Sequence, residues 1–185
     1  MDYIILGLLI LSSRTIYQLR SRIDKGLNYM YSSSTGSIQA AIKKLLNSGC
    51  IDFREIQENG RNKKEYYITE AGRQEFNSWV NGPVDSAGIK CPELSKIYFM
   101  GFSKQKNRIE NIRGYIIDLR NKYEALKMIC DEAESFMQSD SCKKLDKEAE
   151  DIIYFQYAAA RFGRDLMLFT VKWYEDFLNE TEEAL

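Results

Sequence analysis

The chain has 185 residues, of which 44% are hydrophobic and 29% charged, and it contains two prolines and no histidine. This length suits one domain or two small ones, each able to bury its own hydrophobic core. The four cysteines form no CxxC pair, which argues against a zinc site and suits a cytoplasmic protein with reduced thiols. The sequence also lacks phosphate-loop and hydrolase motifs, so neither an enzyme nor a bound cofactor is expected.

Charge divides the chain unevenly. Residues 1–82 hold 11 Lys and Arg against 8 Asp and Glu, a balance of +3, whereas 83–185 hold 15 against 19, a balance of −4. A basic first part followed by an acidic one is typical of a nucleic-acid module joined to a second domain. We therefore predict a DNA-binding domain over 1–82, a linker with a short helix over 83–102, and a helical dimerisation domain over 103–185.

Three helices are predicted first. The apolar run Asp2–Leu11 is too short to span a membrane and indicates a buried helix. The second helix is expected over Thr15–Lys25, ended by Gly26. The third follows a hydroxyl-rich run, places Ile38, Ile42, Leu45 and Leu46 inward, and ends at Asn47.

A hairpin and a fourth helix follow. Short strands are predicted at 51–54 and 65–69, because apolar and polar residues alternate there, and the Asn59-Gly60 step favours a tight turn between them. A helix then begins at Thr69 or Glu70 and ends near 81. This order predicts a mainly α fold with a small β-wing (α+β), that is, a winged helix-turn-helix.

In such a fold the third helix enters the major groove and the wing lies along the DNA backbone or in the minor groove. Hydroxyls at the helix start would bind phosphate, exposed polar residues further along would read bases, and basic residues at the turn would bind the backbone. The predicted DNA-binding residues are Ser33, Ser34, Thr35, Ser37, Gln39, Lys43, Arg61, Lys63 and Lys64. Two alternatives remain: the basic turn is only a solvated tip, or the domain is an adaptor that binds protein.

The second half is predicted to be helical. After a linker at 84–91, a short apolar helix is expected over 92–102, a long helix from Ser103, and a last helix over 143–179. The long helix carries a coiled-coil seam spaced 3-4-3-4: Ile109, Ile112, Ile116, Leu119, Tyr123, Leu126, Cys130, Ala133 and Met137. The last helix carries a second stripe at steps of four and three: Phe155, Ala159, Phe162, Leu166, Phe169 and Trp173.

These patterns predict a helical hairpin that pairs with a second copy as a homodimer, with a purely intrachain hairpin as the alternative. Two winged helices on a two-fold axis would read an inverted repeat with half-sites about one helical turn apart. A small-molecule effector pocket is also considered where the first helix, the linker and the last helix meet. Its candidate lining residues are Tyr98, Phe102, Phe169 and Trp173, and the favoured alternative is that these are core aromatics.

The first 82 residues resemble the N-terminal domain of PadR-like transcriptional regulators. The opening run 5–9 and the stretch 17–19 fit, and further matching positions are Gly36, Ser37, Leu45, Gly49, Gly60, Arg61, Lys64, Tyr66, Tyr67, Thr69 and Gly72. Two sites depart from the family pattern: Ile16 replaces a usual glycine, and Gln39-Ala40 replace a common aromatic and proline. The resemblance implies a homodimeric repressor, in some members released by a small-molecule inducer.

Overall fold

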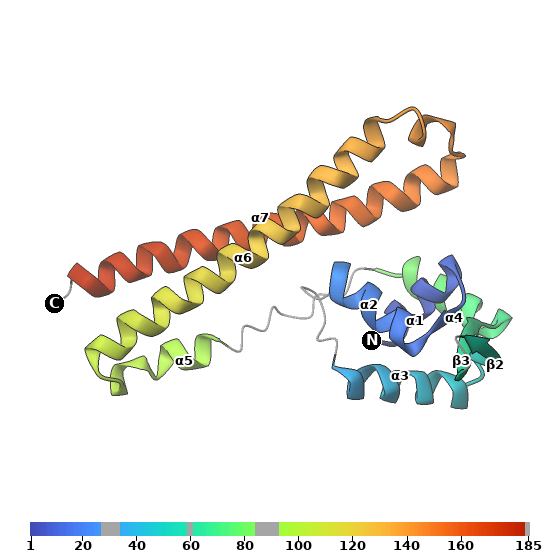
Figure 1. Cartoon of the computed structure of the whole chain (residues 1–185), viewed down its shortest axis with the longest axis horizontal. Coiled ribbons are helices and arrows are strands. Elements are labelled where there is room, and N and C mark those ends of the chain that lie inside the picture. Colours follow the sequence, from blue (N-terminus) through green and yellow to red (C-terminus); the bar gives the residue numbers. More distant parts are fainter. Residues whose placement is uncertain (27–33, 59–60, 84–92, 184–185) are drawn as a thin grey trace. The chain divides into compact units, whose positions relative to one another are not determined.

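The computed structural model describes residues 1–26, 34–58, 61–83 and 93–183, with the side chains of Lys25, Gly26, Glu58 and Arg61 left out of the description (Figure 1). It contains two compact units, 1–87 and 88–185. Within the described ranges, no helix has both the length and the apolar character needed to cross a membrane.

Unit 1 contains four helices and a three-stranded sheet. The helices are α1 (Asp2–Leu11), α2 (Ile16–Gly26), α3 (Thr35–Asn47) and α4 (Glu70–Val80). The strands are β1 (Arg14–Thr15), β2 (Ile51–Glu58) and β3 (Arg61–Ile68), antiparallel and in the order β1-β3-β2. Strands β2 and β3 form the wing, with Ile51 opposite Ile68 and Glu58 opposite Arg61.

The core of unit 1 forms around α1, which is apolar on most sides. Its Ile5 and Leu6 are fully buried, together with Leu19 of α2 and Ile38 of α3. Helices α3 and α4 and strand β3 all pack on α1. Because each surrounding helix is apolar on one face only, this arrangement buries those faces and leaves the outer face of α3 in solvent.

The start of α2 differs from the prediction. Thr15 belongs to β1 rather than to the helix, and its Oγ1 accepts a hydrogen bond from the Gln18 amide at 3.3 Å. Gln18 Oε1 in turn accepts from the Thr15 amide at 2.9 Å, which completes a capping box. The helix therefore begins at Ile16, and it includes Gly26, which we had expected to end it.

The wing strands are longer than predicted, eight residues each. Alternation in the sequence fades after Arg54, but backbone pairing continues through Ile56 opposite Lys63 and Gln57 opposite Asn62. Ladder hydrogen bonds, unlike side-chain burial, need no particular side chain, so the strands extend beyond their apolar residues.

Unit 2 is built on a helical hairpin. Two long helices, α6 (Gln105–Gln138) and α7 (Lys147–Glu183), are joined through the 3-10 turn η2 (Cys142–Lys144). The predicted helix over 92–102 is two short elements, α5 (Leu94–Tyr98) and the 3-10 turn η1 (Met100–Phe102). The last helix begins at 147 instead of 143, because the Asp146 carboxylate accepts the Ala149 amide at 2.9 Å as a cap.

The predicted seam of α6 packs against α7 within the chain. Its residues Ile112, Ile116, Leu119, Leu126 and Cys130 are buried. Ion pairs join the same two helices at Arg113–Glu182 and Arg120–Glu175, at 2.7 and 2.6 Å. Since residue numbers fall on one helix as they rise on the other, the hairpin is antiparallel.

Candidate nucleic-acid interface

The first turn of α3 is closed by hydrogen bonds between two serines. Ser34 is the N-cap, and its Oγ accepts from the Ser37 amide at 3.2 Å. The Ser37 hydroxyl donates back to the Ser34 carbonyl at 2.8 Å. Ser34, predicted to bind phosphate, and Ser37, predicted to read bases, therefore also hold the helix end together. The amides of Thr35 and Gly36, in the first turn, have no acceptor within the helix. Ser33 lies outside the described residues.

A continuous polar strip lies along α3, which we call the α3 outer face. It consists of Thr35, Gly36, Gln39, Ala40 and Lys43, all exposed. The opposite side of the helix is buried through Ile38, Ala41, Ile42 and Leu45. Three predicted DNA-binding residues, Thr35, Gln39 and Lys43, thus lie on one solvent-facing side, four residues apart, as base reading by one helix requires.

The neighbouring Lys44 has a structural role instead. Its ammonium lies 2.6 Å from the Asp2 carboxylate, which links α3 to the first residue of α1. The hydrogen bond and the charge of Asp2 raise the pKa of Lys44. The buried side of α3, which includes Ile42 and Leu45, sets the rotation of the helix and turns Lys43 outward.

The junction between α3, β2 and α4 depends on Thr69 and Gly72. The Thr69 hydroxyl donates to the Gly49 carbonyl at 2.6 Å and accepts the Gly72 amide at 3.2 Å, which caps α4. A Cβ at Gly72 would lie 2.0 Å from the Cys50 carbonyl oxygen, so only glycine fits. The sequence predicted a helix start at Thr69 or Glu70, and Thr69 is the N-cap. For Gly72 the sequence offered only its match to the family pattern, because the close approach of the Cys50 carbonyl depends on the fold.

The wing has two chemically different faces, because side chains alternate along a strand. One face carries Lys63 and Glu65, and the other carries Asn62 and Lys64. On the first face Arg54 forms an ion pair with Glu65 at 2.6 Å. Lys63 and Lys64, predicted as part of one basic cluster, are therefore on opposite sides of the wing, and the side chain of Arg61 lies outside the description.

Lys64 also has an intramolecular partner. Its ammonium lies over the ring of Phe53, 4.0 Å from the centroid. Phe53 in turn packs against Tyr66, whose pKa burial raises. The contact draws Lys64 toward the root of the wing, on the side opposite Lys63.

Comparison with known proteins identifies this architecture. Residues 5–78 match the model of the transcriptional regulator PadR-like family. The chain is 28% identical over 181 residues to the negative transcriptional regulator PadR of Bacillus subtilis (strain 168), which covers 89% of this chain and 98% of that protein. Both matches relate unit 1 to the PadR-like family of transcriptional regulators, whose members are regulators and not enzymes.

Solved PadR structures share the fold over both units. The crystal structure of Bacillus subtilis PadR in complex with operator DNA has a TM-score of 0.74 at 23% identity and covers 97% of this chain and 96% of that one. The structure of the same protein in complex with p-coumaric acid has a TM-score of 0.65 at 22% identity, with 98% of each chain covered. The winged helix followed by long C-terminal helices is thus the PadR arrangement.

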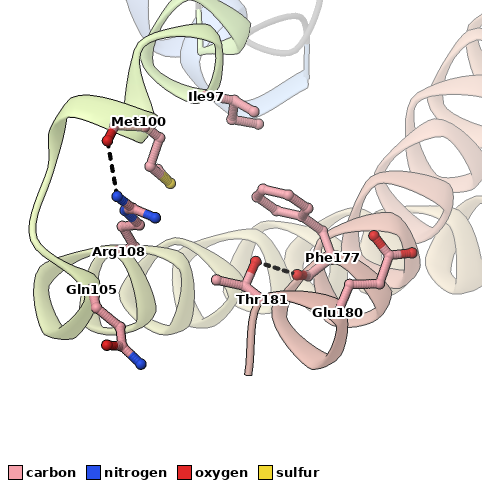
Figure 2. Close-up of a pocket in the computed structure, with 8 residues that line it drawn as sticks. Ile97, Met100, Gln105, Arg108, Phe177, Glu180 and Thr181 are labelled. Atoms are coloured by element: carbon pink, nitrogen blue, oxygen red, sulfur yellow. Dashed lines mark hydrogen bonds between the residues drawn. The ribbon is translucent and has the colours of Figure 1, made fainter. Parts of the chain in front are cut away.

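Unit 2 contains an open cavity of about 490 Å³ between the α5–η1 segment and the ends of α6 and α7. Figure 2 shows Ile97, Met100 and Phe177 around the space, with Arg108 on the Met100 side and Glu180 on the Phe177 side. The Arg108 guanidinium donates to the backbone carbonyls of residues 103 and 101, at 2.8 and 2.9 Å.

The residues considered for an effector pocket are all exposed: Tyr98, Phe102, Phe169 and Trp173. They do not line this cavity, although the Trp173 ring stacks on Phe177 with centroids 5.2 Å apart. Nor are they core aromatics of unit 2, which was the alternative. The sequence contained no signal for Arg108, because a lone arginine near a helix start is usually a surface residue.

Proposed function

We propose that the chain is a sequence-specific DNA-binding repressor. The observation that carries this proposal is the α3 outer face, an exposed strip on a helix that packs against α1, α2 and β2. Gln39 and Lys43 would read base edges, since glutamine suits adenine and lysine suits guanine. Arg61 and Lys63 of the wing would bind the phosphate backbone. The Bacillus subtilis relative, a negative regulator solved with operator DNA, supports this direction of control.

The repressor would act as a homodimer through the C-terminal helices. One stripe of α7, which we call the α7 outer stripe, is left uncovered by α6, and its Phe155, Phe162 and Phe169 are 67%, 64% and 64% exposed. These three residues recur every seven positions, with Leu166 and Trp173 between or beside them, also exposed. A heptad-spaced aromatic stripe in water calls for a partner helix, and a second copy supplies the same stripe by symmetry.

A dimer of winged helices would bind an inverted repeat with half-sites about one helical turn apart. Sedimentation of the full chain at micromolar concentration tests the assembly. We expect a dimer for the native protein and a monomer for Phe162→Asp, with matched helicity by circular dichroism. The exposed Gln156 of the same helix, changed to Asp, is the control for charge alone.

We also propose that a small-molecule effector releases the repressor from DNA. The relative's complex with p-coumaric acid supports an effector, and the cavity beside Arg108 is a place of suitable size in this chain. Apolar walls from Met100 and Phe177 with a guanidinium at one side suit a small organic acid. Loss of DNA binding on adding such acids, abolished in Arg108→Gln, is the expected result.

The decisive experiment is selection of bound fragments from the protein's own genome. Enrichment of an inverted repeat supports the repressor, and loss of that enrichment in a Gln39→Ala, Lys43→Ala variant assigns the reading to α3. Recovery of no fragment by a folded dimer would refute DNA binding and favour the adaptor alternative, in which the winged helix binds protein.

A further inference from the structure

The glycines of unit 1 differ in why they are glycine. At Gly72 a Cβ would collide with the Cys50 carbonyl, and at Gly7 it would come within 3.1 Å of the Phe76 ring. Gly49 has a φ of +68°, which only glycine adopts readily. Gly72 and Gly49 therefore require glycine because of the fold itself, and a larger residue at Gly7 would have to displace the Phe76 ring slightly.

Neither a close contact nor the backbone conformation explains why position 36 is glycine. A Cβ built on it meets no atom of the described residues within 4 Å, and its φ lies outside the left-handed region. It lies in the first turn of α3, two residues after the N-cap Ser34. A helical glycine lowers stability relative to alanine, so at this exposed position it weakens the fold with no gain inside the described chain.

The missing side chain of Gly36 leaves the helix backbone accessible on the α3 outer face. Gly36 belongs to this face, one turn before Ala40 and directly beside Ser37 and Thr35. The two positions of this face with the smallest side chains are thus consecutive along one line of the helix surface. An approaching duplex would meet helix backbone along that line, flanked by the longer side chains of Gln39 and Lys43.

We infer that Gly36 is a positioning residue for DNA: its lack of a side chain sets how deeply the start of α3 enters the groove. A methyl group here would hold the duplex about 1.5 Å further from the helix backbone. This displacement would lengthen the contacts of Gln39 and Lys43 with bases together with those of the first-turn amides. The inference rests on the proposed DNA binding. It adds Gly36, a residue that would act because it has no side chain.

The test is Gly36→Ala, because its two effects have opposite signs. The melting temperature of unit 1 should stay unchanged or rise by up to about 5 °C, since alanine favours the helix. Affinity for the selected operator should fall roughly tenfold or more, the usual size of a steric misfit in a packed contact. Gly36→Leu should lower the affinity further without unfolding the protein.

Gly114→Ala is the matched control. Gly114 is also helical and exposed, and a Cβ there likewise meets no atom within 4 Å, but it lies in α6 of the other unit. Its operator affinity should equal that of the native protein. Native affinity for Gly36→Ala, or an equal loss in both variants, would overturn the inference. Failure of the native protein to bind any DNA would refute the proposed function instead, so the two failures are distinguishable.

Discussion

The two wing lysines should affect DNA binding differently, although they are adjacent in sequence. Lys63 lies on the wing face that also carries Glu65, whereas Lys64 lies on the other face with its ammonium over Phe53. A wing lying along a DNA backbone presents one face to it. We therefore expect Lys63→Ala to remove a phosphate contact and Lys64→Ala to leave the contacts intact.

The magnitude follows from counterion release. Each phosphate contact contributes about 0.9 to the slope of log affinity against log salt concentration. A dimer that loses one contact in each wing should therefore show a slope that is smaller in magnitude by about 1.8. Over a fourfold rise in salt this makes the loss of affinity roughly tenfold smaller than in the native protein. Lys64→Ala should instead lower the stability of unit 1 by about 0.5–1 kcal/mol, the usual range for an exposed cation–π contact.

Fluorescence anisotropy with the selected operator, titrated across a range of KCl concentrations, measures both slopes. Lys127→Ala, an exposed lysine of α6, controls for the change in net charge and should leave the slope unaltered. A flattened slope for Lys64→Ala with a native slope for Lys63→Ala would show that the opposite face of the wing meets the DNA. Equal flattening would refute the division of the wing into two faces.

Three further outcomes are expected for the fold. Gly72→Ala should destabilise unit 1 by about 3 kcal/mol or more, because the Cβ would lie 2.0 Å from the Cys50 carbonyl oxygen. That oxygen cannot easily move, since it accepts the Thr69 amide at 3.1 Å. Urea unfolding followed by Trp79 fluorescence in a Trp173→Phe background measures the loss. An effect below about 0.5 kcal/mol would contradict the packing. Ser34→Ala should cost about 1 kcal/mol by the same assay through loss of the α3 cap, and no change would show that Ser37 alone closes the turn. The raised pKa of Lys44 means that its contact with Asp2 stabilises unit 1 below the lysine's unfolded pKa and is lost as pH rises through the folded value. The native protein should therefore be more stable than Asp2→Asn near neutral pH, and this difference in urea unfolding should vanish on alkaline titration.

Much of unit 1 could be predicted from its sequence, because its elements carry strong local signals. The 3.6-residue period of Ile38, Ile42 and Leu45 gave the buried side of α3, and hence the outer face by exclusion. The Asn59-Gly60 step gave the hairpin. Strand β1 could not be found, since two residues carry no periodicity, and it forms only because β3 offers Tyr66 and Glu65 as partners.

The candidate site was predicted less completely, for a geometric reason. Sequence places Arg61, Lys63 and Lys64 in one basic cluster, but alternation along β3 separates Lys63 from Lys64 once the strand is known to reach Arg61. The prediction began the strand at 65 and treated the residues before it as a turn, in which side chains have no fixed face. An error of four residues in a strand boundary therefore changed the expected chemistry of the wing.

Helix α7 shows where sequence patterns are ambiguous and the structure decides. Its stripe of Phe155, Phe162 and Phe169 has the stronger heptad pattern, so sequence alone would pair it with α6. The structure instead buries Val171 and Tyr174 against α6, a face offset around the helix, and leaves the stronger stripe in water. Both stripes have the same spacing, and spacing does not tell an intrachain neighbour from an intermolecular one. Because the weaker stripe is sufficient to close the hairpin, the stronger one is available for a second copy, and the proposed dimer would form through it.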